Sequence, residues 1–209
     1  MSTAALVLYL VALVVVFGVR TAVQIRRTGS SGFHGISGTP GSLRWWAGVL
    51  FVLALVVSAA SLVLAVAGVV APPAGDDVSA MAVVGLLLVI AGFIGVVLAQ
   101  SGMGTSWRIG VDESERTDLV TGGLFALVRN PIFTAMVATQ AGLTLMVPTW
   151  LSVVALVCLT VAVELQVRLI EEPYLLAAHP RRYRTYASTT GRFVPGVGRL
   201  PAPAEARIR

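Results

Sequence analysis

The sequence has 209 residues, of which 56% are hydrophobic, and its mean hydropathy is +0.88. Soluble domains are only about 45–50% apolar, so this composition excludes an ordinary soluble domain. The net charge of +5 comes from arginine alone, because the sequence contains no lysine. Since the arginines flank apolar runs, we expect membrane lipids as their partners, and neither nucleic acid nor a metal. The single cysteine, Cys158, excludes a disulfide within the chain.

The apolar runs predict an all-α integral membrane protein, because a helix needs about 20 apolar residues to cross a bilayer. We expect about five transmembrane helical segments, of which the fourth is short and forms a helical hairpin with the fifth. Small residues every four positions in the third segment, at Ala91, Gly95 and Ala99, are typical of close helix packing. The expected segments are Ala4–Val19, Ala47–Val70, Val78–Ala99, Thr134–Val147 and Leu151 to about Ile170.

The placement of arginine predicts the orientation in the cell membrane. The loops after the first and third segments and the C-terminal tail hold all 15 basic residues, if Arg168 is counted at a helix end. The link after the second segment and the turn at Pro148 hold none. By the positive-inside rule, we expect the N-terminus outside and the C-terminus in the cytosol.

Two polar stretches border the predicted hairpin and are expected on its cytosolic side. The first is Arg129-Asn130-Pro131-Ile132-Phe133, where a polar loop enters the membrane. Arginine at such a depth is usually paired or functional, although a helix start flanked by a positive-inside arginine is the alternative interpretation. In the second stretch Glu164, Arg168 and Glu172 are four residues apart, which predicts that they share one helical face.

Together these stretches resemble the isoprenylcysteine carboxyl methyltransferase family and its phospholipid methyltransferase relatives, over about Gln100–Pro195. The family pattern has Arg-His-Pro-x-Tyr, an apolar hairpin, Glu-Glu-x-x-Leu and a motif with two tyrosines. Here the same order is given by the Arg129 stretch, by Glu171-Glu172-Pro173-Tyr174-Leu175, and by Tyr183 with Tyr186. Asn130 stands where the family has histidine, and Phe133 where it has tyrosine. Asparagine still donates and accepts hydrogen bonds, so a cofactor-binding role survives the change.

The resemblance implies an S-adenosylmethionine-dependent methyltransferase with a cytosolic C-terminal cofactor-binding region. It implies membrane helices one to three in residues 1–99 and a catalytic region in residues 100–209. The catalytic candidates are Arg129 and Glu172, and the substrate candidates are Gln140 and Arg168. Carboxylates suit the ammonium or ribose of the cofactor, a cation suits its carboxylate, and aromatic rings suit its adenine. The cofactor-binding candidates are Gly123, Phe125, Val128, Arg129, Asn130, Pro131, Phe133, Glu171, Glu172, Tyr183 and Tyr186.

The methyl acceptor is expected to be lipophilic and to arrive from the membrane. A carboxylate acceptor, such as that of an isoprenylcysteine, is already a nucleophile, whereas an amine or phenol needs a base such as Glu172 or Glu171. The residues leave this choice open. Two further hypotheses also stay open. One is an NADPH-dependent membrane reductase of the steroid-reductase-like type, and the other is a non-enzymatic membrane protein with a decayed site.

Overall fold

The computed structural model describes residues 1–31, 35–36, 38–71, 76–104 and 118–203. Over these residues the chain is helical, and its one β feature is an isolated parallel bridge between Val128 and Gly191. Four helices are long and apolar enough to cross a membrane, and one shorter apolar helix accompanies them. The all-α membrane fold predicted from the apolar runs is therefore confirmed.

The N-terminal segment is longer than the apolar run that predicted it. Helix α1 (Ser2–Leu13) continues through the π-helical turn η1 (Val14–Val19) into α2 (Arg20–Thr28). The helix ends at Gly29, whose φ of 74° is left-handed and favours glycine. The prediction that this segment ends at Val19 was wrong, because the end of the apolar run does not mark the end of the helix. The polar α2 extends it beyond the apolar part.

The second and third segments are α3 (Leu43–Val66) and α4 (Asp76–Met103). Ser42 caps α3, since its side-chain oxygen accepts a hydrogen bond from the backbone N–H of Trp45 at 3.2 Å. This cap explains why α3 begins four residues before the expected Ala47. Both helices are long and apolar enough to span the membrane.

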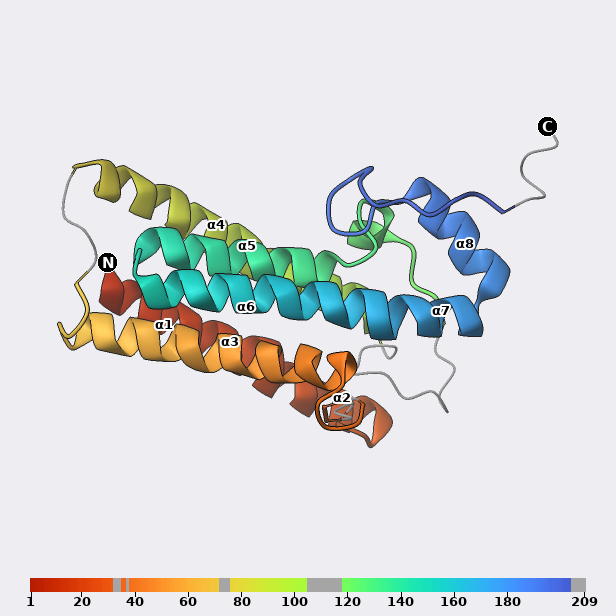
Figure 1. Cartoon of the computed structure of the whole chain (residues 1–209), viewed down its shortest axis with the longest axis horizontal. Coiled ribbons are helices and arrows are strands. Elements are labelled where there is room, and N and C mark those ends of the chain that lie inside the picture. The colour runs from red at the N-terminus through yellow and green to blue at the C-terminus, as the bar shows by residue number, and fades with distance from the viewer. Residues whose placement is uncertain (32–34, 37, 72–75, 105–117, 204–209) are drawn as a thin grey trace.

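The predicted hairpin is formed by α5 (Pro131–Met146) and α6 (Trp150–Gln166). The turn between them is closed by a capping box, in which the side chains of Thr149 and Ser152 each accept a bond from the other's backbone N–H. Thr149 also bonds Ser61 of α3, with 2.7 Å between the two hydroxyl oxygens. In Figure 1, α5 and α6 form the centre of the bundle, where α4 packs along α5 and α3 along α6.

Helices α4 and α5 approach closely through glycines. A Cβ atom on Gly92 would overlap Thr139, and one on Gly85 would meet the backbone of Gly142. The sequence predicted small-residue packing on this helix, but it placed Ala91 in the contact. Ala91 is exposed, whereas its neighbour Gly92 is buried. The error has a simple cause, because a shift of one residue rotates a side chain by about 100° around a helix.

The last segment also runs further than expected. Helix α6 continues through the π-helical turn η4 (Val167–Glu171) into α7 (Glu172–Ala178), and α8 (Pro180–Thr189) follows. Arg168 is exposed while Glu172 is buried, so two residues predicted to share one face differ in their surroundings. The wider π turn shifts the helical register between them.

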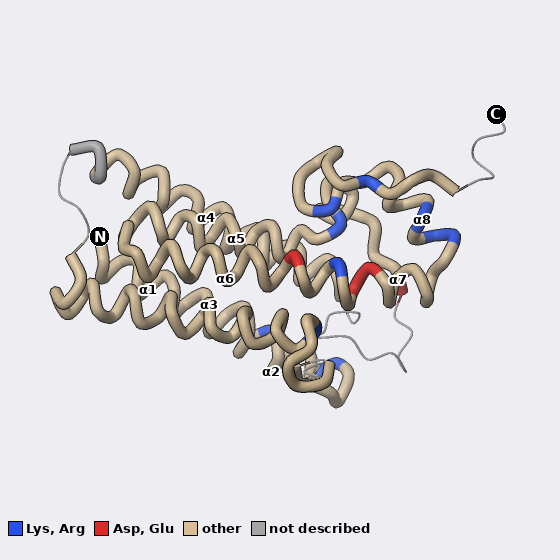
Figure 2. Tube along the Cα trace, in the orientation of Figure 1, with Lys and Arg blue, Asp and Glu red and all other residues tan. Residues whose placement is uncertain are grey.

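Charged side chains gather at one end of the bundle. Figure 2 shows the described arginines and glutamates around α2, α7, α8 and the tail, while the opposite end lacks such colours in the described part. This distribution agrees with the uneven placement of arginine from which the orientation is predicted. Which end faces the cytosol stays a prediction.

Candidate functional site

The site is built where the start of α5 meets the C-terminal tail. Pro131 is the first residue of α5, a position that tolerates its missing N–H. The backbone N–H of Arg129 donates to the carbonyl oxygen of Gly191 at 2.8 Å, and that of Asn130 donates to Arg192 at 3.1 Å. The Asn130 side chain does not cap α5, because its Nδ2 donates to the same Arg192 carbonyl at 3.1 Å. Two segments about 60 residues apart in sequence are thereby held side by side.

The guanidinium of Arg129 is the centre of this arrangement, and its side chain is 1% exposed. One terminal nitrogen donates to the carbonyl oxygens of Ala187 at 3.0 Å and Thr190 at 2.7 Å. The other donates to the carbonyl oxygen of Gly198 at 3.0 Å and to Oε1 of Glu172 at 2.6 Å. The Nε atom of Arg129 is buried and has no hydrogen-bond partner. This arginine therefore joins α5, α7, α8 and the tail.

Glu172 lies between two guanidinium groups. Arg192 binds it in a bidentate manner, with Nε 2.8 Å from Oε1 and a terminal nitrogen 2.9 Å from Oε2. The Glu172 side chain is 9% exposed and that of Arg192 is 13% exposed. The hydrogen bond to Glu172 raises the pKa of Arg192 above its ordinary value. The three side chains together carry one excess positive charge, which suits an anionic group of a ligand.

The two predicted tyrosines anchor α8 to the turn before α5. The hydroxyl of Tyr186 donates to the carbonyl oxygen of Phe125, in the 3₁₀ turn η3 (Gly123–Ala126), at 2.5 Å. Tyr183 is 1% exposed, and its ring packs edge-on against that of Tyr186 with 6.2 Å between centroids. Burial raises the pKa of Tyr183, and it raises the pKa of Tyr186 to about 12. Both phenols therefore stay neutral near pH 7.

The remaining cofactor-binding candidates lie around the cluster of Arg129, Glu172 and Arg192. Gly123 has a φ of 60°, which explains a glycine at the start of η3. Val128 forms the bridge to Gly191. Phe133 is half-buried and packs in a small apolar cluster with Phe193 of the tail. Glu171 is half-buried and adjoins Glu172.

The two substrate candidates lie elsewhere. Arg168 is exposed and pairs with Glu164 on the outer side of α6. Gln140 is buried and lies ten residues into α5 from Asn130, about 15 Å along the helix axis. The structure therefore brings the cofactor-binding candidates together at one end of the bundle, with Gln140 deeper in the bundle and Arg168 outside.

Sequence reasoning missed the role of Arg192. Nothing in the sequence links Arg192 to a carboxylate 20 residues before it. A usable signal was present: Arg129 and Arg192 both lie close to apolar stretches, and each needs an anion if it is buried. Residues 105–117 of the polar loop before the Arg129 stretch lie outside the described residues, as does His34.

Comparison with known protein families gives a match. Residues 80–182 match the model of the phospholipid methyltransferase family. No curated protein and no solved structure matches the chain. The match covers nearly all of α4, the whole hairpin and the start of α8, and it includes Arg129 and Glu172. The resemblance inferred from the motifs is therefore confirmed by an independent comparison.

Proposed function

We propose that the protein is a membrane methyltransferase that uses S-adenosylmethionine and acts on a lipophilic acceptor, since residues 80–182 match the model of the phospholipid methyltransferase family. The observation that carries the proposal is the buried cluster of Arg129, Glu172 and Arg192 at one end of a membrane bundle. It lies within and beside the segment that the family model matches. When bound, S-adenosylmethionine supplies a methyl group on a positively charged sulfur.

The residues around the cluster fit such a cofactor. The excess positive charge and the unpartnered buried Nε of Arg129 suit the cofactor carboxylate. Phe133 offers an aromatic surface for adenine, and Glu171 offers a carboxylate for the ammonium group or the ribose. Asn130 holds the tail in place through Arg192, so we assign it a positioning role. Glu172 and the tyrosines, whose polar atoms bind protein groups, would shape the site rather than contact the reacting atoms.

The geometry favours an acceptor that needs no base. Both oxygens of Glu172 already accept hydrogen bonds from guanidinium groups, which leaves this carboxylate poorly placed to take a proton. An acceptor carboxylate of the isoprenylcysteine type reacts without losing a proton. Its oxygen would take the methyl group that S-adenosylmethionine supplies, which would give a methyl ester and the demethylated thioether. The protein then contributes alignment and the exclusion of water.

The proposal includes the location of the reaction. We propose a multi-pass protein of the cell membrane with its N-terminus outside and the cluster at the cytosolic face, where the water-soluble cofactor is available. We also propose residues 100–209 as the catalytic region and residues 1–99 as the supporting helices, although α4 in the latter packs along α5. The acceptor would reach the cluster from the bilayer beside the hairpin.

Calorimetry with the purified protein tests cofactor use. We expect S-adenosylmethionine or its demethylated product to bind, and NADPH not to bind. Glu171→Ala should weaken binding about tenfold, whereas Asp118→Ala, which removes an exposed carboxylate before η3, should leave it unchanged. Binding of NADPH alone would favour the reductase hypothesis, and binding of neither cofactor would favour the non-enzymatic one.

A series of acceptors tests the substrate class. Carboxylates that share one head group and carry isoprenyl chains of increasing length would be assayed with a radiolabelled methyl donor. We expect catalytic efficiency to rise with chain length, because each buried methylene contributes about 0.8 kcal/mol. Equal efficiency for the soluble short-chain member would contradict access from the bilayer. Methylation of a phospholipid amine in place of the carboxylates would contradict the acceptor assignment alone.

A further inference from the structure

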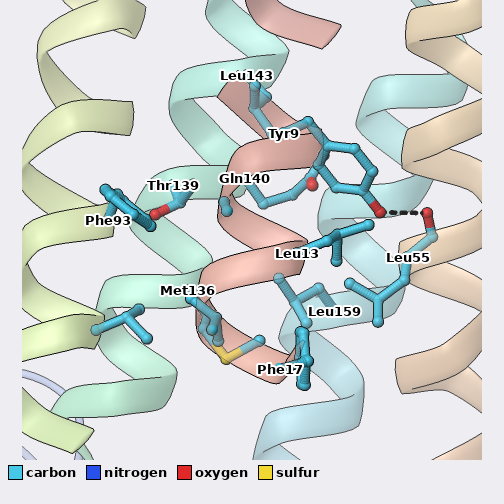
Figure 3. A pocket seen from close by; sticks show the side chains of 13 residues that line it. Tyr9, Leu13, Phe17, Leu55, Phe93, Met136, Thr139, Gln140, Leu143 and Leu159 are labelled. Atoms are coloured by element: carbon cyan, nitrogen blue, oxygen red, sulfur yellow. Dashed lines mark hydrogen bonds between the residues drawn. The ribbon is translucent and has the colours of Figure 1, made fainter. Parts of the chain in front are cut away.

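A second site is indicated by a cavity among the membrane helices, separate from the charged cluster. The cavity has a volume of about 60 Å³ and is lined by α1, η1, α3, α4, α5 and α6. Figure 3 shows Tyr9, Leu13 and Phe17 among the lining residues, with Phe93 and Thr139 on the opposite side of the view. A single water molecule needs about 10–15 Å³ of such volume, so this cavity can hold more than one water.

The lining is apolar except for the side chains of Tyr9, Thr139 and Gln140. The Tyr9 hydroxyl donates to the carbonyl oxygen of Leu55 at 2.6 Å, the bond drawn in Figure 3. The Thr139 hydroxyl donates to the carbonyl oxygen of Ala135 in its own helix at 2.9 Å. The protons of both hydroxyl groups are therefore already used within the protein.

Gln140 differs from these two residues. It is 6% exposed, and its Oε1 accepts a hydrogen bond from the Ser58 hydroxyl at 2.9 Å. With this bond made, Nε2 is buried and has no hydrogen-bond partner. A buried amide donor without an acceptor is unfavourable. The cavity is therefore lined by apolar side chains and by one amide whose Nε2 lacks an acceptor.

We propose that this cavity binds an uncharged lipophilic molecule whose apolar body carries a carbonyl or ether oxygen, which accepts a hydrogen bond from Gln140 Nε2. Because Gln140 lies deep in the bundle, the oxygen of the ligand has to lie within the ligand's apolar body. Gln140 lies ten residues after Asn130, about 15 Å along α5, and the hydrocarbon core is about 30 Å thick. The ester groups of ordinary phospholipids lie at the surface of that core and do not reach this depth.

Photolabelling in lipid nanodiscs tests this site without any methyl donor, so its result is independent of the proposed methyl transfer. The probe is a long-chain methyl ketone with a diazirine on its chain, and the reference is the alkane with the same diazirine. We expect saturable labelling of peptides that contain Phe93 or Met136, several-fold stronger for the ketone than for the alkane. Unlabelled ketone should compete, whereas added phospholipid should not.

Two variants separate ligand binding from helix packing. Gln140→Met removes the donor at similar volume, and it should lower ketone labelling several-fold, to the level of the alkane. Ser58→Ala removes the hydrogen bond to Oε1 but keeps Nε2, so it should retain the preference for the ketone. Thermal unfolding shows whether both variants are folded. Equal labelling by ketone and alkane in the parent protein, labelling that does not saturate, or an unchanged preference in Gln140→Met would overturn the site.

Discussion

Two ion pairs that involve the continuous helix from α6 to α7 show how burial changes the energetic value of an ion pair. Arg168 and Glu164 are paired at the surface, with side chains 55% and 38% exposed, while Arg129 and Glu172 are nearly enclosed. Exposed pairs contribute at most about 1 kcal/mol. Removing one partner of a buried pair costs about 3–5 kcal/mol, because the other charge stays buried without compensation. Both Arg129 and Arg192 therefore need Glu172 as their counter-charge.

This contrast gives the first prediction. Glu172→Gln should destabilise the purified protein by about 3–5 kcal/mol, because Arg129 loses its counter-charge. Glu164→Gln, the matched control in the same helix, should change stability by less than about 1 kcal/mol. Thermal unfolding in detergent measures both changes. Equal small effects would show that Arg129 is compensated by the carbonyl groups of the tail alone.

A glycine in the tail gives the second prediction. A Cβ atom on Gly191 would overlap the backbone of Val194 and Gly196, so no side chain can yield to make room for it. We expect Gly191→Ala to displace the tail from Arg129 and to expose it to protease.

Gly122→Ala is the control for this variant, since Gly122 has open space and a φ of −94°. Limited proteolysis and cofactor binding should be altered in Gly191→Ala alone. A tail equally protected in both variants would show that the loop can shift without releasing the arginine.

At the scale of the elements, the sequence predicted which segments are helical better than where the helices end. Apolar runs located all five segments, because the bilayer requires long apolar helices. The ends were missed where polar helices continue the apolar ones, as in α2 and α7. The register after Gln166 was missed because a π turn has no strong signature in sequence.

The candidate site was only partly predictable for a related reason. The Arg129 and Glu172 stretches were identified from their motifs, and the structure places them in contact. The pairing of Arg129 with the carbonyl groups of Ala187, Thr190 and Gly198 depends on how the tail folds back. Backbone carbonyl groups are present at every residue, so no sequence pattern marks these three.

Close packing of α4 on α5 gives the third prediction. Gly92→Val should destabilise the bundle by about 1–3 kcal/mol, because the added carbons overlap Thr139 and the backbone of Ala135. The control is Ala91→Val, one residue earlier on the exposed side of the same helix. Unfolding in mixed detergent and SDS compares the two variants. If Ala91→Val were the more harmful, the contact face of α4 would be the one expected from sequence.

At the scale of the whole molecule, the charge distribution separates two ends with different tasks. The described arginines surround the cluster end, and the apolar helices carry the cavity near Gln140 deeper in the bundle. A water-soluble cofactor and a lipophilic ligand would therefore approach from different phases. This division requires one fixed orientation in the membrane. The positive-inside rule predicts that the arginine-rich end faces the cytosol.

The fourth prediction is this orientation. Cys158 is first replaced by serine, and single cysteines are introduced at Ala71, in the link after α3, and at Ala202, in the tail; both positions are exposed. In intact cells an impermeant maleimide should label the Ala71 site and leave the Ala202 site unlabelled. In inverted vesicles the pattern should reverse. The two sites lie beyond opposite ends of helices long and apolar enough to cross the membrane, so labelling of both from one side would reject the spanning arrangement itself. A complete but reversed pattern would keep the fold and place the cluster outside the cell, away from the cytosolic cofactor, so it would contradict the proposed methyl transfer.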